Sequence, residues 1–333
     1  GKAGTYTPSN GWVEAGVFVL EVDDVTLQGM TVSSPAPGIM LAKSEDVLLR
    51  ELWLTKCNNV GLFMDGGSAT LEAVHISDVV QTEDTNGMGI LLNLEARAEL
   101  NHSLIESLKF TAILADGLGT ELVVSDSTVR DIFWTYGVGS SGIMVISGAS
   151  GLVERTLVER CDGRGIRSLF AGSHIDLRSS TARECTPGPG GQGGLGVEVT
   201  HGAGASILES STVDNHSAGV GVFDIGSSAT IKSTVSRGTI PSESGNGGLG
   251  FGLLDEAEVS LVGSVAWGNR VMGLTVNGSP PPSLEAVGCL LGNNTGTETD
   301  EASFGVFVTE GATATLKYSV VEEAQGAGAI SLD

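Results

Sequence analysis

Residues 165–218 read GIRSLFAGSHIDLRSSTARECTPGPGGQGGLGVEVTHGAGASILESSTVDNHSA and contain one unit twice. Each copy starts with a glycine, Gly165 or Gly196, and continues with two alternating apolar runs separated by a turn of small residues. A long Gly/Pro-rich loop closes the first copy and a short turn closes the second. The pair begins again at Gly219 and at Gly273, because 219 − 165 = 54 and 273 − 219 = 54. A fixed period of this kind indicates units that bury their apolar faces on their neighbours.

The unit can be followed outward along the chain from its leading residue. The leading residues are Gly16, Gly38, Gly61, Gly89, Thr111, Gly142, Gly165, Gly196, Gly219, Gly250, Gly273, Gly305 and Gly328. Thr111 takes its place because 165 − 111 = 54. Period-two runs of β-branched and aliphatic residues bounded by Gly, Ser and Asn predict strands, and no stretch carries the apolar stripe of an amphipathic helix. We therefore expect an all-β chain.

Turns of about 22–23 residues are too short for propeller blades, which need about 40. They fit a single-stranded parallel β-helix, a solenoid of about twelve turns stacked roughly 4.8 Å apart. We expect residues 1–15 to form an incoming strand or cap, and residues 16–333 the β-helix. Inward positions should form an apolar ladder that stabilises the rod. Its expected members include Ile143, Ile166, Val197, Val220, Phe251, Leu274 and Val306.

Long and short turns alternate along the chain. In each long turn the extra residues fall just before the next leading glycine, in the segments 81–86, 133–137, 187–194, 241–248 and 293–303. Five long loops should therefore line one edge of the rod, about 10 Å apart. Insertions gathered on one face of a solenoid often form its binding face. They can also be neutral decoration, because surface insertions cost little free energy.

Composition limits the classes of partner. The chain has 17 Lys+Arg against 40 Asp+Glu, a net charge of −23. Such a surface repels nucleic acid, anionic lipid and polyanionic polysaccharide unless a local basic cleft or a cation intervenes. No apolar run approaches the roughly 20 residues of a membrane span. Four cysteines are too few for a disulfide scaffold. We expect neither nucleic acid nor a membrane span.

The opening residues Gly4-Thr5-Tyr6, the first rung VFVLEVDDVTLQGMTV at 17–32 and the Gly-led turns carry a resemblance to a known group. The chain resembles the right-handed parallel β-helix proteins of the pectate-lyase-like superfamily, and within it the repeat-containing secreted bacterial proteins. The resemblance implies an extracellular or cell-surface location. It says little about function, because the superfamily holds lyases, hydrolases, epimerases, adhesins and structural proteins.

Motifs of the enzymatic branches are incomplete here. Of the polygalacturonase-like set, the chain offers only Thr200-His201-Gly202 and Asp23-Asp24, in unrelated places. The sequence therefore predicts a non-enzymatic extracellular protein with a structural or adhesive role. Its partner would be a polysaccharide or a protein at the long-loop edge, and the rod ends would self-associate or continue through unpaired strand edges. The alternative is a polysaccharide lyase, epimerase or glycoside hydrolase.

Asp224, Asp255 and Glu256 are the candidate catalytic residues if the chain is an enzyme. Asp224 follows the first strand of one turn and Asp255 that of the next, so the two carboxylates can stack on one face. Paired carboxylates perform general acid and base chemistry. Alternatively, all three are solvated turn acids on a very acidic surface.

Two long loops carry further candidates. The aromatic residues Phe133, Trp134 and Tyr136 would bind sugar rings or a protein partner, or fold back onto the rod as a small satellite core. Three acidic residues of the last long loop would supply oxygen ligands to Ca²⁺, the one cofactor that we consider. These residues are Glu298, Asp300 and Glu301.

Cys161 and Cys185 occupy the same place in consecutive turns. Stacked neighbours would lie about 4.8 Å apart, inside the Cα range that a disulfide permits. Either a disulfide or a pair of free thiols fits this spacing. The column continues at Asn215 and Asn269, because 215 − 161 = 54 and 269 − 215 = 54. We expect Asn there to satisfy backbone groups of the turn.

Overall fold

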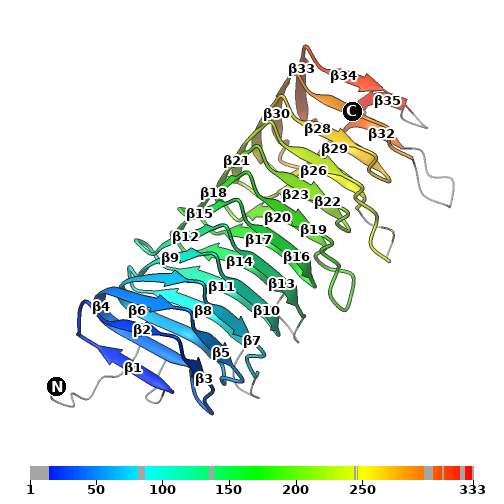
Figure 1. Ribbon diagram of the computed structural model, residues 1–333. Coiled ribbons are helices and arrows are strands. Elements are labelled where there is room, and N and C mark those ends of the chain that lie inside the picture. Colours follow the sequence, from blue (N-terminus) through cyan, green and yellow to red (C-terminus); the bar gives the residue numbers. More distant parts are fainter. Residues whose placement is uncertain are drawn as a thin grey trace.

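The computed structural model describes residues 15–81, 87–134, 139–243, 245, 247–295, 303–309, 311–322 and 327–331. Within these ranges every regular element is a β-strand. The chain winds through turns of three strands, and the turns stack along one axis from the N-terminal to the C-terminal end (Figure 1). Every pairing between named strands is parallel, which confirms the predicted all-β parallel β-helix. No described segment forms a helix of the length and apolarity needed to cross a membrane.

The strands form three series, one on each face of the rod. We call the strand that follows each leading residue the leading strand. The leading strands are β1 (Val17–Leu20), β4 (Ile39–Arg50), β6 (Val60–Glu72), β8 (Met88–Asn93), β11 (Thr111–Asp116), β14 (Ser140–Ile146), β17 (Gly163–Leu169), β20 (Leu195–Thr200), β23 (Ala218–Val222), β26 (Leu249–Leu254), β29 (Met272–Asn277), β32 (Phe304–Val308) and β35 (Ala327–Ser331).

The second series follows each leading strand after a short turn, and the long strands β4 and β6 run through both series. Its other members are β2 (Thr26–Gln28), β9 (Arg97–Asn101), β12 (Glu121–Ser125), β15 (Ser150–Glu154), β18 (His174–Arg178), β21 (Gly204–Leu208), β24 (Ser228–Lys232), β27 (Glu258–Val262), β30 (Ser283–Val287) and β33 (Thr313–Lys317).

The third series closes each turn. It comprises β3 (Thr31–Val32), β5 (Trp53–Thr55), β7 (His75–Ser77), β10 (Leu104–Leu108), β13 (Thr128–Ile132), β16 (Leu157–Cys161), β19 (Thr181–Arg183), β22 (Ser211–Val213), β25 (Val235–Arg237), β28 (Val265–Trp267), β31 (Leu290–Gly292) and β34 (Val320–Glu322). It is a 12-stranded sheet with one strand per turn, in agreement with the prediction of about twelve turns.

The predicted inward ladder is present. Ile143 pairs in register with Ile166, and the same column continues through every member named from the sequence. All of these side chains are at most 2% exposed. Toward the N-terminus the column extends through Ile113, Ile90, Leu62, Ile39 and Val17. Continuous burial of apolar surface, at about 25 cal/mol per Å², is the main stabilising contribution of such a rod.

The column of leading residues corrects one prediction. Ile113 pairs with Ile143, so Ala112, and not Thr111, lies beside Gly142. The interval to the next pair of turns is therefore 165 − 112 = 53. Glycine predominates in this column because a β-carbon would press on the next turn: one built on Gly142 would lie 2.6 Å from the carbonyl oxygen of Gly165.

The turns before the leading strands are lined by a polar and thiol column. Asn215 Oδ1 accepts a hydrogen bond from the backbone N–H of Cys185 at 3.0 Å, and its Nδ2 donates to the carbonyl of Ala182 at 3.1 Å. Asn269 repeats this arrangement with its own preceding turn. The expected role of Asn in satisfying turn backbone groups is therefore confirmed.

The long loops connect third-series strands to leading strands. They follow β7, β13, β19, β25 and β31, every second member of that series, and the described parts of the loops after β19 and β25 project from the same edge of the rod (Figure 1). Loop 187–194 is a small hairpin with Pro187 bridged to Gly193, and loop 241–248 repeats it with Pro241 and Gly247. Residues 1–14, 82–86, 135–138 and 296–302 lie outside the described residues.

Candidate functional site

The outward face of the leading strands changes character halfway along the rod. The outward column begins with apolar side chains that form a second buried cluster, ending at Met144. In the next turn its place is taken by Arg167, and in the turn after that by Glu198. Glycines 221 and 252 follow. In this column charged side chains therefore first appear at β17 and β20, next to the edge that carries the long loops.

Glu198 lies between two arginines on this face. Arg164 Nε donates to Glu198 Oε2 at 3.0 Å and its Nη2 to Oε1 at 3.4 Å, while Arg167 Nε forms an ion pair with Oε2. The three side chains are only 14%, 15% and 6% exposed for Arg164, Arg167 and Glu198. Burial lowers the pKa of Arg167, and the Glu198 charge opposes that shift. Two guanidinium groups against one carboxylate leave one positive charge, a local basic site on an otherwise acidic protein.

Trp134 forms the wall of this site on the long-loop side. A β-carbon built on Gly139 would lie 3.1 Å from the Trp134 ring and would also meet Arg164 Nη1. A β-carbon on Gly188 would lie 2.1 Å from two atoms of the same ring, too close for both to fit. The indole therefore packs on loop 187–194 beside Arg164. Trp134 was predicted from the sequence as a binding residue, but its packing on loop 187–194 was not.

The other predicted binding aromatics lie apart from this packing or outside the described residues. Phe133 precedes Trp134 and is 48% exposed at the same edge. Tyr136 lies outside the described residues. The aromatic group predicted from the sequence is therefore seen here as one packed ring and one exposed ring.

Asp224 lies beyond the other end of the leading strands, in the turn after β23. Its Oδ2 lies 3.0 Å from Nδ1 of His201 in the preceding turn and also accepts a hydrogen bond from Thr200 Oγ1. Phe170 packs edge-on against the imidazole, with ring centroids 5.6 Å apart. A carboxylate that holds one imidazole nitrogen leaves the other available for proton transfer. The sequence contains a signal for this pair, because the interval 224 − 201 = 23 is the length of one turn.

Asp255 and Glu256 occupy the corresponding turn one level on. Val222 pairs with Leu253, so Asp255 holds the position of Asp224 in the next turn. Its backbone N–H donates to the carbonyl of Asn277 at 3.3 Å, whereas the Asp224 carboxylate contacts His201 of the preceding turn. Glu256 N–H donates to Pro280 at 2.9 Å. Both residues have positive φ, 51° and 55°, and are half-buried turn residues.

A hollow of about 630 Å³ lies behind loop 187–194. It is lined by Asp162, Thr186, the loop residues 187–191, His216 and Glu243. Thr186 Oγ1 donates to Asp162 Oδ1 at 2.9 Å. Burial lowers the pKa of His216, against the opposing charge of Glu243. The hollow offers polar groups to a ligand that extends past the loop.

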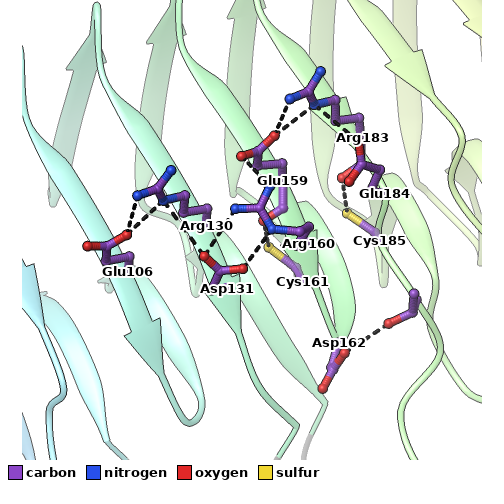
Figure 2. Close-up of polar contacts among 11 residues, drawn as sticks. Glu106, Arg130, Asp131, Glu159, Arg160, Cys161, Asp162, Arg183, Glu184 and Cys185 are labelled. Atoms are coloured by element: carbon purple, nitrogen blue, oxygen red, sulfur yellow. Dashed lines mark hydrogen bonds and ion pairs between the residues drawn. The ribbon is translucent and has the colours of Figure 1, made fainter.

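The third-series face carries a ladder of ion pairs (Figure 2). In register across four strands, Glu106 is followed by Arg130, Glu159 and Arg183. Arg130 Nη2 lies 2.6 Å from Glu106 Oε2, and Arg183 Nε donates to Glu159 Oε2 at 2.8 Å. Each carboxylate is matched by a guanidinium, so we assign this ladder to stability and not to ligand binding.

No three His, Cys, Asp or Glu side chains of the described ranges gather into a metal-binding group. Glu298, Asp300 and Glu301, the predicted calcium ligands, lie outside those ranges. Cys161 and Cys185 are both buried free thiols.

Comparison with known proteins identifies the fold. A family model described as "Right handed beta helix region" matches residues 60–240. No curated protein sequence matches the chain significantly. Among solved structures, the periplasmic alginate epimerase AlgG is 13% identical, with a TM-score of 0.59 over 93% of this chain and 79% of that one.

Two further structures are similar over most of the chain. The catalytic unit of the GH87 α-1,3-glucanase from Streptomyces thermodiastaticus is 12% identical, with a TM-score of 0.51 over 95% of this chain and 63% of that one. Vag8, in its complex with C1 inhibitor, is 14% identical, with a TM-score of 0.50 over 93% and 77%. At these identities the similarity shows the fold alone, and any chemistry has to be argued from the residues of this chain.

Proposed function

Since the chain belongs to the right-handed β-helix family, we propose that it binds a uronate-containing polysaccharide across the outward face of β17, β20 and β23 and acts on it as a lyase or epimerase. This is the alternative interpretation of the sequence, preferred here over a purely structural or adhesive role. A location outside the cytoplasm, extracellular or periplasmic, is part of the proposal.

The observation that carries the proposal is the meeting of two charged groups on one face. Arg164 and Arg167 exceed Glu198 by one positive charge, and His201 is held by Asp224 one turn away. Arg167 pairs with Glu198, and His201, the first residue after β20, follows Glu198 by three residues, which limits their backbone separation to about 10 Å. One uronate ring and two side chains span that distance.

This arrangement suits proton abstraction next to a carboxylate. The excess guanidinium charge would stabilise the sugar carboxylate as negative charge develops on it. The free nitrogen of His201 would take the proton from the adjacent ring carbon, with Asp224 stabilising the imidazolium. Return of a proton to the opposite face gives an epimer. Expulsion of the glycosidic oxygen, which takes up a proton, gives an unsaturated sugar.

Two further features support the proposal. Trp134 and the hollow beside loop 187–194 extend the site along the edge, as binding of several sugar rings requires. The similar structures include proteins described as an alginate epimerase and an α-1,3-glucanase. The names of those proteins agree with polysaccharide processing on this fold.

The test is incubation with polymannuronate, polygalacturonate and a neutral glucan, with and without Ca²⁺. Unsaturated-uronate absorbance reports elimination, proton NMR of the polymer reports epimerisation, and co-sedimentation reports binding. We expect product only from a polyuronate, and loss of product in His201→Gln but not in His174→Gln, an exposed histidine on the second-series face. Binding without product in the parent protein would contradict the enzyme and restore the adhesive role.

A further inference from the structure

Cys161 and Cys185 are placed side by side by the register of their strands. Leu157, Val158 and Glu159 pair with residues 24 positions later, and 185 − 161 = 24 extends the same register to the two cysteines. The backbone N–H of Thr186 donates to the carbonyl of Cys161 at 3.0 Å, which keeps the register past the end of the strands. Adjacent parallel strands are about 4.8 Å apart, within the range of Cα separations in disulfides.

The two thiols have matching surroundings in the interior of the rod. Both side chains are 0% exposed. Each Sγ donates to the carbonyl oxygen two residues before it, at 3.7 Å. Each also lies beside the leading glycine of its turn: a β-carbon on Gly142 would be 3.2 Å from Cys161 Sγ, and one on Gly165 would be 3.1 Å from Cys185 Sγ. The missing side chains leave the sulfur atoms room to approach each other.

The sulfur atoms interact in the reduced state. A hydrogen bond with the Cys185 thiol, together with burial, raises the pKa of Cys161 well above its usual range. Both side chains are also buried, and a thiol kept away from solvent does not undergo exchange. Once the turns have closed, the two thiols are therefore inert toward oxidants in solution.

The other two cysteines have different surroundings. Cys57 Sγ lies against the carbonyl of Val32, near the N-terminal end, and Cys289 Sγ against that of Leu261, near the C-terminal end. Neither is in register with a second cysteine among the strands described. They serve as internal references for thiol chemistry in the same molecule.

From this geometry we infer that Cys161 and Cys185 form a disulfide inside the rod when the chain folds in the presence of a disulfide oxidant. One thiolate attacks the oxidant and releases one of its thiolates, and the second attacks the resulting mixed disulfide and releases the other, so that one S–S bond replaces two S–H bonds. The two protons and two electrons lost by the cysteines convert the oxidant to its two thiols. The bond covalently joins two consecutive turns, those that lead into β17 and β20.

Because the folded interior excludes reagents, the redox state is set during folding and then retained. The same chain would give a cross-linked rod where folding occurs under oxidising conditions and a dithiol rod where it occurs under reducing conditions. This inference does not depend on the proposed function, because neither thiol lies on the outward face.

The experiment refolds the full chain from denaturant, either with reduced and oxidised glutathione or with dithiothreitol. Each product is alkylated under denaturing conditions and analysed by intact mass and peptide mapping. With glutathione we expect two alkylated cysteines, Cys57 and Cys289, and one linked peptide pair containing Cys161 and Cys185. With dithiothreitol we expect four alkylated cysteines. Four alkylated cysteines in both products, or a link to Cys57 or Cys289, would overturn the inference.

Two further measurements test retention and effect. Dithiothreitol added to the folded, cross-linked protein should leave the bond intact, and should reduce it once denaturant is present. The cross-linked form should melt a few degrees above the dithiol form, because the bond restricts the unfolded chain. Cys57→Ser should still form the bond, and Cys161→Ser should not. If Cys161→Ser fails to fold, the peptide mapping of the parent protein still shows whether Cys161 and Cys185 are linked.

Discussion

Arg160 binds Asp131 of the neighbouring turn with two atoms of its guanidinium. Nε donates to Oδ1 at 2.7 Å and Nη2 donates to Oδ2 at 3.1 Å, although 29 residues separate the two in the chain. Its Nη1 also lies 2.5 Å from Glu159 Oε1. The bonds connect neighbouring third-series strands and link the ladder of Figure 2 into a network. Networks of this kind contribute more than isolated surface pairs.

The network predicts loss of stability in acid. The hydrogen bond from Arg160 lowers the pKa of Asp131. Burial alone would raise the pKa of Glu159, but hydrogen bonds from Arg183 and Arg160 outweigh it and the pKa is lowered. Both pKa values are thus depressed on folding, so the stabilisation is present above the unfolded pKa values of about 4 and is lost as pH falls through the folded ones. The urea concentration at the midpoint of unfolding should therefore decrease as the pH is lowered from about 5 to about 2.

Arg160→Gln separates this network from general acid effects. The variant should be less stable than the parent at pH 7, and the difference should shrink as pH falls below 4, because the parent then loses the same bonds. Lys43→Gln is the matched control, since Lys43 lies 3.9 Å from Glu21 with both side chains mostly exposed. An equal pH dependence in parent and Arg160→Gln would contradict the prediction.

Glu198→Gln should destabilise the fold by about 3 kcal/mol, because it leaves two buried guanidinium groups without a counter-charge. Urea unfolding measured by circular dichroism gives the free energy. Glu258→Gln changes the same atoms on an exposed side chain of the second series and should cost less than about 0.5 kcal/mol. Equal costs in the two variants would show that the Arg164–Glu198–Arg167 group is not held as described.

Asp224→Asn should lower turnover of a polyuronate by roughly 10²-fold or more, since the amide cannot stabilise a charged His201. Its melting temperature should change little, because the Asp224 side chain is 41% exposed. Asp255→Asn, in the same position one turn on, should leave turnover unchanged. Equal losses in both variants would implicate the pair of carboxylates that the sequence suggested and remove the special role of His201.

Ile166→Ala should cost about 2–5 kcal/mol, because it leaves a cavity in the centre of the apolar ladder. Ile225→Ala removes the same atoms from a side chain that is 62% exposed and should be nearly neutral. Chemical denaturation of both variants makes the comparison. A small effect of Ile166→Ala would indicate that adjacent turns close around the cavity.

Gly188→Ala should displace Trp134, because the added β-carbon would occupy the volume of the indole. We expect a red shift of tryptophan emission and weaker co-sedimentation with the polysaccharide. Placing the same change in a Trp134→Phe background should abolish the spectral shift, which separates Trp134 from the other tryptophans. An unchanged spectrum would mean that the loop moves and the ring does not.

The architecture could be predicted from the sequence because neighbouring turns repeat each other. Every ladder position from Ile143 to Val306 is apolar, and the glycine before it is excluded from carrying a side chain by the carbonyl of the next turn. The one misplaced leading residue reflects the same dependence on glycine as the marker of each turn. Only twelve of the thirteen places hold glycine, and Ala112, which takes the remaining one, gives no such signal beside Thr111.

The site could be predicted only in part, because outward positions do not repeat. Arg167 and Glu198 are adjacent in the structure but 198 − 167 = 31 residues apart in the chain, with the insertion 187–194 between them. Because the insertions differ in length, the sequence alone does not show which outward side chains pair in register on neighbouring turns. His201 and Asp224, with no insertion between them, were one turn apart and open to prediction. In the ion-pair ladder only the step from Arg130 to Glu159 crosses an insertion, 133–137; the steps from Glu106 to Arg130 and from Glu159 to Arg183 are each 24 residues and were also open to prediction.

Among the strands described, every pairing joins consecutive turns of the rod. Residues 219–272 form one short and one long turn, 272 − 219 + 1 = 54 residues, and their removal would bring Ala218 next to Gly273 with the strand alternation unbroken. The rod can thus become longer or shorter by tandem duplication or deletion of two-turn modules. Deletion of this module would shorten the molecule and leave the Arg164–Glu198–Arg167 group in place, but it would also remove Asp224, the partner of His201, so in this module length and chemistry are inherited together.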